Sequence, residues 1–317
     1  MQVLVLAGGR GVRLRPLTSD CPKPLLALGD RPILTHIVAG TPGELLITVI
    51  VAPGLEEPFR RWQSGLAERR RVRLYVEPYS ADGPLGPVRA LAACVDELEI
   101  DDDLLILMGD SLLPFALQDF FAGAAGDLLR LAAYRLPDLD RASRFGVIEI
   151  GPGEMVERFE EKPARPRSPW VFTGCLYIPR RLISALPRAG CDGPANAGDL
   201  VAEYLRQGER IQVFRTAGDW HDIGTFESYL EAHRSLLTDG RRQLLAAQGN
   251  RLRGAVYVHS SAQVAGSVLQ DCVVMANARV LDAELIDCVV QPGTVVVGRT
   301  VRQRLVTARG ELSFTED

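Results

Sequence analysis

Short apolar runs rich in β-branched residues alternate with amphipathic segments along the N-terminal half of the chain. The apolar runs have the length of strands, and the segments between them space their apolar residues as helices do. This pattern predicts strands at 3–7, 46–52, 72–76, 104–108 and 129–133, and helices at 32–38, 55–65, 87–95 and 117–124. Such alternation is typical of sheets covered by helices on both faces. The expected fold class is therefore α/β, with a Rossmann-like mixed, mainly parallel sheet.

The pattern is less regular beyond these elements. Strands are predicted at 145–150 and 171–178, on either side of a polar, proline-containing connection, and helices at 198–207 and 225–237. The last of these helices ends near a glycine, and a linker is expected at about 241–253. We therefore expect a first domain that spans residues 1–240.

A repeat with a period of 16 residues lies beyond this linker. The segment SVLQDCVVMANARVLD, which starts at Ser267, aligns with the later segment AELIDCVVQPGTVVVG, and a preceding copy places Val264 over Val280. Small and β-branched residues that recur at a short fixed period indicate the stacked coils of a parallel β-helix. We expect a short β-helix domain at 251–317, with a plain β-rich tail as the alternative. Its open edges need covering by the first domain or by another subunit, which favours a homo-oligomer.

Composition and charge narrow the class of protein. The 317 residues are 47% hydrophobic and 24% charged, which suits one large core with a small appendage. A net charge of −4 gives no sign of a broad basic surface, so neither nucleic acid nor a membrane is an expected partner. The start, MQVLVLAGGRG, is too short an apolar run for a secretory signal. The six cysteines show no metal-ligand spacing, and we interpret them as reduced thiols of a cytoplasmic protein.

A glycine-rich segment, LAGGRGVRLRPLT, follows the first predicted strand. Glycines let backbone N–H groups turn inward and approach phosphates closely, a role that fits Gly8, Gly9 and Gly11. The segment lacks the GK[ST] of a P-loop and the GxGxxG of a dinucleotide site, and by itself it fits an ordinary turn equally well. Arg13 lies within it and Lys23 follows between prolines. These two cations are either candidates to neutralise a phosphate under attack or ordinary solvated surface charges.

Two aspartates are candidate metal ligands. Asp110 directly follows the apolar run LLILMG, and a buried strand delivers such a carboxylate to the crevice where ligands bind. The alternative for Asp110 is a helix N-cap. Asp222 lies in WHDIGT, between apolar residues and a glycine turn. Two carboxylates completed by phosphates and water suit Mg²⁺, so we predict one magnesium ion held by Asp110 and Asp222.

In order and spacing, several motifs resemble those of the sugar nucleotidyltransferases, which include mannose-1-phosphate guanylyltransferases and glucose-1-phosphate thymidylyltransferases. The motifs are LAGGRGVRLRPLT, PKPLL, PLGPVRAL, LMGDSL, FGVIEI, FEEKP, FTGCLYI and WHDIGTFESYLEA, and they cover nearly all of residues 1–237. The resemblance implies an enzyme that joins a nucleoside triphosphate to a sugar-1-phosphate and releases pyrophosphate. It also implies that the C-terminal β-helix is left-handed.

The resemblance assigns the chemistry to particular residues. Nucleotide binding is implied for Leu6, Ala7, Gly8, Gly9, Gly11 and Gly86, and sugar-phosphate binding for Gly146, Glu161, Lys162, Thr173 and Gly174. Arg13 and Lys23 are the expected catalytic residues, with Mg²⁺ as the cofactor. Without the resemblance, the EEK run at Glu161 is interpreted as an ordinary charged surface segment.

Departures from the family pattern bear on the choice of substrate. At 87–89 the chain reads PVR where relatives often carry threonine and glycine, which leaves the nucleotide preference open. The sequence KPL at 23–25, in place of KQL, favours the guanylyl type. No arginine lies near Asn196, so sugar-phosphate binding is expected to rely more on Lys162.

The expected activity is therefore that of a mannose-1-phosphate guanylyltransferase, and three alternatives stay open. The first is a glucose-1-phosphate thymidylyl- or uridylyltransferase. The second is a non-catalytic subunit that senses sugar nucleotides. The third, an acyltransferase site in the β-helix, has only His259 in its favour.

Overall fold

The computed structural model describes residues 1–67, 70–79, 85–122, 127–186, 196–236 and 244–313. The chain forms two compact units, one of residues 1–9 with 36–220 and the other of residues 10–35 with 221–317. The division predicted from the sequence, into domains at 1–240 and 251–317, stays a prediction.

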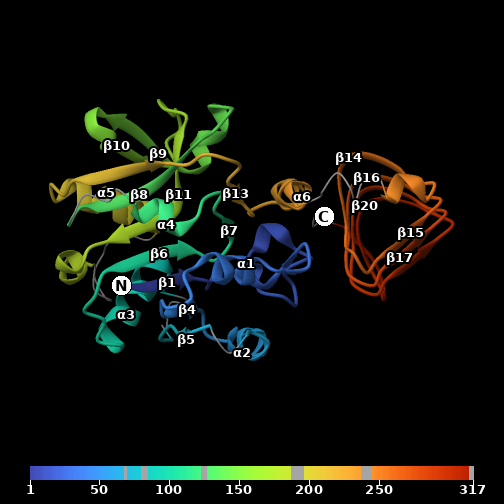
Figure 1. The fold of residues 1–317 in the computed structure, drawn as a ribbon, viewed down its shortest axis with the longest axis horizontal. Helices are drawn as coiled ribbons and strands as arrows, with labels where there is room; N and C mark the ends of the chain where they lie inside the picture. Colours follow the sequence, from blue (N-terminus) through green and yellow to red (C-terminus); the bar gives the residue numbers. More distant parts are fainter. Residues whose placement is uncertain (68–69, 80–84, 123–126, 187–195, 237–243, 314–317) are drawn as a thin grey trace. The chain divides into compact units, whose positions relative to one another are not determined.

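A nine-stranded sheet forms the centre of the first unit, in the order β5-β4-β1-β6-β11-β8-β12-β10-β9 (Figure 1). Its strands are β1 (Gln2–Leu6), β4 (Ile47–Val51), β5 (Val72–Val76), β6 (Leu104–Met108), β8 (Leu129–Arg135), β9 (Gly146–Gly151), β10 (Met155–Glu161), β11 (Trp170–Ile178) and β12 (Ile211–Arg215). β1 pairs in parallel with β4 and β6, β4 with β5, and β8 with β12. The apolar runs of β1, β4 and β6 are continuous because both faces of these strands are buried.

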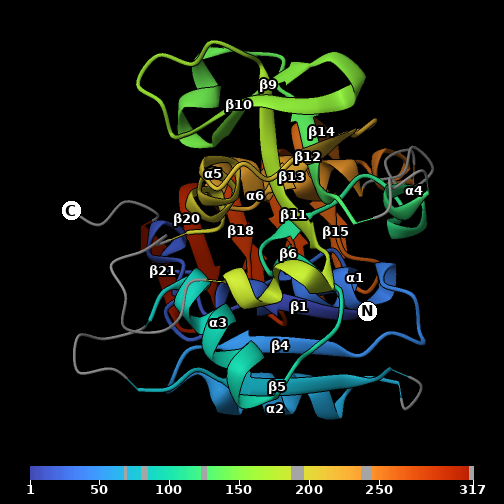
Figure 2. The same ribbon diagram turned by 90° about the vertical axis from the view of Figure 1, so that its left-hand side faces the viewer.

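The sheet is mixed, as predicted, and all of its strands except β10 and β11 run in the same direction. β11 returns between β6 and β8 and pairs antiparallel with both. β9 and β10 form an antiparallel pair that extends the edge opposite β5, and Figure 2 shows them side by side there. Parallel pairing is therefore confined to the β5-β4-β1-β6 part and to the β8–β12 pair.

Helices cover both faces of this sheet, as predicted. The labelled α-helices in the described part of the chain are α1 (Ile33–Gly40), α2 (Glu56–Ser64), α3 (Pro87–Glu97), α4 (Leu117–Phe121), α5 (Ala197–Arg206) and, in the second unit, α6 (Phe226–Ser235). Successive residues of a strand face opposite sides. Val213 of β12 shares one buried cluster with residues of α3 and α5. The next residue, Phe214, has its ring 5.6 Å from that of Phe120 in α4, on the other side.

Shorter elements join these strands and helices. The 3₁₀ helices are η1 (Val12–Leu14), η2 (Lys23–Leu25), η3 (Asp140–Arg144), η4 (Pro152–Glu154) and η5 (Arg180–Ala185). The two-residue strands are β2 (Ala27–Leu28), β3 (Arg31–Pro32), β7 (Ser111–Leu112) and β13 (His221–Asp222). The predicted helix at 117–124 ends at Phe121, and its residues 123–124 lie outside the described part of the chain. Sequence patterning missed β10, because its sequence, MVERFEE, has charged residues at four of seven positions.

The C-terminal strands of the second unit stack in parallel at the predicted 16-residue spacing, except β21, which pairs antiparallel with β20. One sheet contains β14 (Arg251–Val258), β16 (Val268–Val274), β18 (Glu284–Val290), β20 (Thr300–Thr307) and β21 (Gly310–Ser313), and the other contains β15 (Gln263–Ala265), β17 (Arg279–Leu281) and β19 (Val295–Val297). Val264 of β15 pairs with Val280 of β17, which pairs with Val296 of β19. These sheets are consistent with a β-helix, whose closure and left-handedness stay predictions.

The stack is one strand longer than the sequence repeat indicates. Three copies were apparent in the sequence, but β20 adds a fourth parallel strand, in which Leu305 pairs with Val289. Its sequence, TVRQRLVT, keeps the buried apolar positions while losing the DCVV letters that made the repeat visible. The predicted linker at 241–253 is also partly wrong, since residues 244–247 are helical and β14 already begins at Arg251.

The loop that follows β1 belongs to this second unit. The buried hydroxyl of Tyr229 in α6 donates a hydrogen bond of 2.6 Å to the carbonyl oxygen of Ala27. α6 also packs against β14 and β16. One helix therefore links the loop residues 10–35 to the stacked strands.

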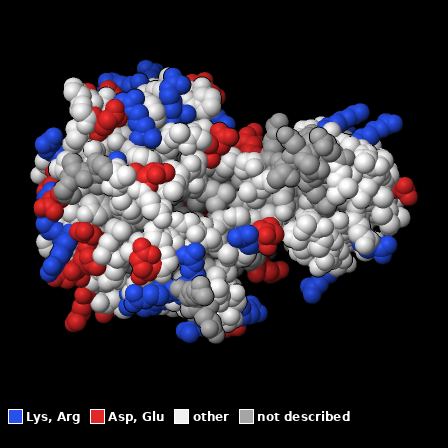
Figure 3. Space-filling model, viewed as in Figure 1, with Lys and Arg blue, Asp and Glu red and all other residues white. Residues whose placement is uncertain are grey.

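Charged side chains are interspersed on the face shown in Figure 3, where the described Lys and Arg residues lie among Asp and Glu. Because the net charge of the chain is −4, a phosphate ligand is expected to meet a local positive site.

Within the described ranges, no helix combines the length and the apolar character needed to cross a membrane.

Candidate active site

A cavity of about 260 Å³ lies at the carboxyl end of the parallel strands β1 and β6. It is lined by Leu6, Ala7, Gly8, Gly9, Ile50, Glu77, Gly86, Pro87, Ala90, Met108 and Asp110. The lining includes five of the six predicted nucleotide-binding residues and the predicted metal ligand Asp110. The lining residues come from five separate stretches of sequence, and the strand order brings them together. In open α/β sheets, ligands bind in this kind of crevice.

Glycines bring the backbone close to this cavity at two points. A Cβ atom on Gly8 would lie 3.3 Å from the backbone nitrogen of Ala52. Gly86 has φ of 83°, in the left-handed region that glycine tolerates, and it is the N-cap of α3. The N-terminal end of this helix therefore borders the cavity, where the helix dipole favours an anionic group.

The departure at 87–89 is the first turn of α3. Pro87 occupies one of the first two helical positions, where its fixed φ fits and no N–H is needed. Val88 is buried in the main core of the unit. Pro87 therefore suits the start of the helix and Val88 adds to the core. Gly86, which precedes them, still lines the cavity.

Glu77 is a cavity residue that the sequence analysis missed. It directly follows β5, and its side chain is almost fully buried, with 5% of the residue exposed. Burial raises the pKa of its carboxyl group, whereas a hydrogen bond from the backbone N–H of Leu85 acts in the opposite direction. The available signal was its position, since it follows a predicted strand just as Gly8 and Asp110 do.

The second unit holds the predicted catalytic cations together with Asp222. A Cβ atom on Gly224 would lie 3.2 Å from Oδ2 of Asp222 and 3.4 Å from Nη2 of Arg13, so both charged groups flank the same glycine. Arg13 lies in η1, and the oppositely charged Asp222 lies in β13, more than 200 residues later in the chain. The tertiary structure thus brings one predicted metal ligand and one predicted catalytic residue into the same neighbourhood.

Lys23 lies beneath the glycine-rich loop of the same unit. It is almost completely buried in η2, and its Cβ is 3.0 Å from where a Cβ on Gly11 would stand. Gly11 has φ of 62°, and its carbonyl oxygen accepts a hydrogen bond of 2.8 Å from the hydroxyl of Thr18. Gly11 therefore satisfies two demands that a side chain would oppose, a left-handed backbone and close contact with Lys23.

The predicted ligands of the magnesium ion belong to different units. Asp110 is in the first unit and Asp222 in the second. Among the described residues, no group of three or more His, Cys, Asp or Glu side chains is placed to hold a metal ion. A shared site at Asp110 and Asp222 stays a prediction.

Three of the five predicted sugar-phosphate residues lie together. Gly146 at the start of β9 is the register partner of Glu161 at the end of β10. Nζ of Lys162 lies 3.2 Å from Oε1 of Glu161, and the backbone N–H of Lys162 donates to the carbonyl oxygen of Phe145. Burial raises the pKa of the Glu161 carboxyl group, and the neighbouring Lys162 opposes this shift.

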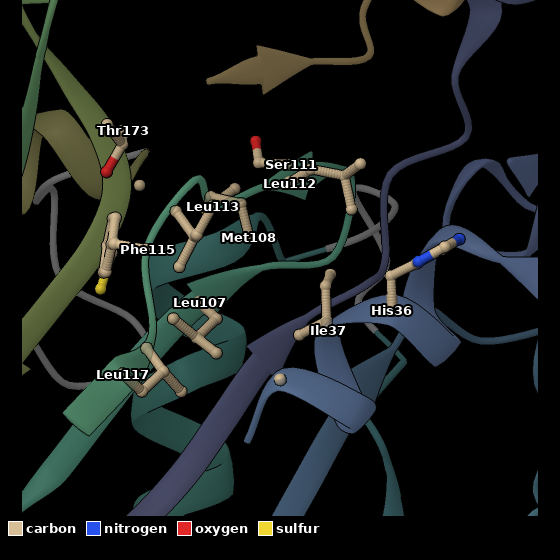
Figure 4. Close-up of a pocket in the computed structure, with 13 residues that line it drawn as sticks. His36, Ile37, Leu107, Met108, Ser111, Leu112, Leu113, Phe115, Leu117 and Thr173 are labelled. Atoms are coloured by element: carbon tan, nitrogen blue, oxygen red, sulfur yellow. The ribbon is translucent and has the colours of Figure 1, made fainter. Parts of the chain in front are cut away.

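The other two, Thr173 and Gly174, line a separate cavity of about 260 Å³ (Figure 4). The hydroxyl of Thr173 donates a hydrogen bond of 3.0 Å to the carbonyl oxygen of Ala132. Gly174 has φ of 84°, at an irregularity in the pairing of β11 with β8. Met108 lines this cavity as well as the one at Asp110, so the two cavities share one side chain.

Comparison with known proteins gives the same assignment as the sequence motifs. A glucose-1-phosphate thymidylyltransferase of Streptomyces griseus is 28% identical over 311 residues, which cover 93% of this chain and 85% of the relative. A second glucose-1-phosphate thymidylyltransferase, from Neisseria meningitidis, is 30% identical over 243 residues, which cover 73% of this chain and 81% of the relative. A mannose-1-phosphate guanyltransferase of Schizosaccharomyces pombe is 25% identical over 281 residues, covering 83% and 73%.

Solved structures show the same fold. The structure of a putative glucose-1-phosphate thymidylyltransferase from Bacillus anthracis matches 75% of this chain and 96% of its own, with a TM-score of 0.62 and 24% sequence identity. The model of the Nucleotidyl transferase family matches residues 2–239 of this chain. The chain therefore belongs to the nucleotidyl transferase family, as the resemblance of its motifs implied.

Proposed function

We propose that this protein transfers a nucleotidyl group from a nucleoside triphosphate to a sugar-1-phosphate and releases pyrophosphate. The observation that carries the proposal is the cavity in which Gly8, Gly9 and Gly86 converge with Asp110. Glycine backbone and the first turn of α3 suit a phosphate chain, and the adjacent carboxylate suits the cation that accompanies it. The relatives that are sugar-1-phosphate nucleotidyltransferases support the same reaction.

The reaction needs positioning and neutralisation of charge more than it needs proton transfer. An oxygen of the sugar phosphate attacks the α-phosphorus in line, and as part of a dianion it is already nucleophilic, so no general base is required. We assign Arg13 and Lys23 to the negative charge that develops on the triphosphate. The guanidinium of Arg13 offers paired donors, and the ammonium of Lys23 acts as a compact charge.

We assign Mg²⁺ to Asp110 and Asp222. Two carboxylates are hard oxygen ligands, and the remaining positions would go to phosphate oxygens and water. When bound, the ion polarises the phosphate under attack. The placement of Asp222 beside Arg13 supports this assignment, because it puts a metal ligand and a phosphate-binding cation in one neighbourhood.

The buried carboxylate of Glu77 favours guanine as the base. An ionised carboxylate only accepts hydrogen bonds. Guanine offers two adjacent N–H donors, at N1 and N2, whereas uracil and thymine offer a single N–H flanked by two carbonyl oxygens. Glu77 lines the same cavity as Gly86 and Pro87, at the start of α3, where the sequence left the nucleotide preference open. It therefore supports the guanylyl activity that KPL at 23–25 favours, with mannose-1-phosphate as the sugar substrate.

A screen of pyrophosphate release tests this function directly. The purified chain is assayed with Mg²⁺ and each of GTP, ATP, UTP, CTP and dTTP against mannose-1-phosphate and glucose-1-phosphate. We expect the highest kcat/KM with GTP and mannose-1-phosphate. Activity with UTP or dTTP and glucose-1-phosphate would favour the thymidylyl or uridylyl alternative. Absence of turnover with every pair, despite binding of a nucleotide sugar, would favour the sensing subunit.

A further inference from the structure

The carboxylate of Glu161 lies between two glycines that come from different elements. Gly146 starts β9, and Gly198 lies in the first turn of α5. A Cβ atom on Gly198 would stand 1.8 Å from Oε2 of Glu161 and 2.6 Å from its Cδ. On Gly146, a Cβ atom would stand 2.9 Å from the same Oε2. Any side chain at position 198 would therefore occupy the space of the carboxylate.

The backbone gives no separate reason for glycine at position 198. Gly198 is absent from the glycines with positive φ, and it lies inside a helix, where alanine is strongly preferred over glycine. The start of this helix is already stabilised by a capping box between Asn196 and Asp199. The closest contact that a side chain at position 198 would make is with the carboxylate of Glu161; the side-chain oxygen of Asn196 follows at 3.3 Å from the Cβ position.

The groups around Glu161 hold its carboxylate in this place. Lys162 pairs with Oε1 at 3.2 Å, on the oxygen that does not contact Gly198. The side chain of Glu161 is only 18% exposed, and that of Lys162 is 59% exposed. Asp199, the next residue after Gly198, repels the carboxylate and, like burial, raises its pKa. The carboxylate is thus confined from two sides and has limited freedom to move elsewhere.

We propose that Gly198 is a positioning residue that sets the affinity for the sugar-1-phosphate by keeping the Glu161 carboxylate in place. This inference rests on the proposed function, in which Glu161 accepts hydrogen bonds from sugar hydroxyls. A side chain at position 198 would turn the carboxylate away from the sugar and leave the nucleotide cavity at Gly8 and Asp110 unchanged, because neither Gly198 nor Glu161 lines that cavity.

The variant Gly198→Ala tests the proposal by separating the two substrates. We expect its KM for the sugar-1-phosphate to rise on the order of 10-fold or more, since small displacements of positioning groups have effects of this size. The KM for the nucleoside triphosphate should stay within about twofold of wild type, because the residues that line the nucleotide cavity are unchanged. The matched control is Gly65→Ala at the end of α2, where the nearest atom to the new Cβ is the carbonyl oxygen of Trp62, at an ordinary contact distance of 3.5 Å.

A second variant asks whether space is the cause. Glu161→Asp shortens the side chain by one methylene group, so the double variant Gly198→Ala with Glu161→Asp should lose less affinity than the two single losses combined. A crystal structure of Gly198→Ala should show the carboxylate displaced from its position beside α5. Fully additive losses, or an unmoved carboxylate, would overturn the proposal.

The outcomes distinguish this inference from the proposed function. If the wild-type chain turns over no sugar-1-phosphate, the proposed function fails and the inference fails with it. If the wild type is active and Gly198→Ala retains the wild-type KM for the sugar-1-phosphate, only the inference fails. Equal rises in both KM values would also overturn it, because they would indicate a general disturbance of the fold.

Discussion

Leu6 and Met108 are register partners at the carboxyl ends of the parallel strands β1 and β6. The N–H of Gly109 donates a hydrogen bond of 2.9 Å to the carbonyl oxygen of Leu6, and a Cβ atom on Gly109 would lie 2.9 Å from that same oxygen. The chain therefore needs glycine at this point to leave β6 close to β1. This relationship places Asp110 in the same cavity as Gly8.

Removing the charge of Asp110 should impair catalysis and its dependence on the metal. We expect Asp110→Asn to lower kcat by on the order of 10²-fold or more and to shift the Mg²⁺ requirement to higher concentration. Titration of pyrophosphate release with Mg²⁺ measures both effects. The control is Asp96→Asn, an exposed aspartate of α3. A wild-type titration curve for Asp110→Asn would remove this residue from the metal site.

Arg13 should contribute through both its charge and its geometry. Arg13→Ala is expected to slow turnover by on the order of 10²-fold, since a phosphate-neutralising donor is lost. Arg13→Lys should fall between this variant and wild type, because lysine keeps the charge but not the paired donors. Steady-state kinetics measure the series, with exposed Arg10→Ala from the same loop as the control. Normal kcat in Arg13→Ala would exclude the assigned role.

Glu77 should determine which base is accepted. Glu77→Gln replaces one acceptor oxygen with a donor, so kcat/KM for GTP should fall by on the order of 10- to 100-fold. The amide donates to one carbonyl of uracil and accepts from its N–H, so the ratio of GTP to UTP activity should fall at least as far. The control, Glu57→Gln, changes an exposed glutamate of α2. An unchanged ratio would show that Glu77 does not contact the base.

The same variant should change how stability depends on pH. Burial raises the pKa of Glu77 in the folded chain above its value in the unfolded chain. The folded state then binds the proton more tightly, so the contribution of this carboxyl group to stability is present at low pH and is lost as pH rises through the raised pKa. Glu77→Gln should therefore have a higher Tm than wild type near pH 8, and the difference should shrink towards pH 4. Calorimetry in the absence of substrates measures Tm for both proteins at each pH. A difference in Tm that stays constant from pH 4 to pH 8 would show that Glu77 does not titrate in this way.

Much of the fold was predictable because local spacing encodes it. The continuous apolar runs of β1, β4 and β6 follow from burial on both faces, and their predicted ends differ from the observed ends by at most one residue. β10 was missed because it is largely polar and only one of its residues, Phe159, is fully buried. β12 was missed because polar residues interrupt its short sequence, IQVFR, and only Ile211 and Val213 are buried, so it lacks a continuous apolar run.

The candidate site was predictable only where a motif marks its residues. Gly8, Gly9 and Asp110 carry signals that a sequence displays, a glycine-rich turn and a carboxylate after an apolar strand. Glu77 carries none beyond its position after β5, and Gly198 is one glycine among 30 in the chain. Their roles depend on what lies next to them in space.

By itself the sequence determined the alternation of strands and helices, the 16-residue period of the C-terminal strands and the family of the chain, because each of these is written in the spacing of neighbouring residues. Only the tertiary structure decided that β11 runs antiparallel between β6 and β8, that Glu77 joins Gly8 and Asp110 around one cavity, and that Gly198 lies against Glu161. The physical reason is that strand order, register and close contact arise from the packing of segments distant along the chain, which no local period specifies.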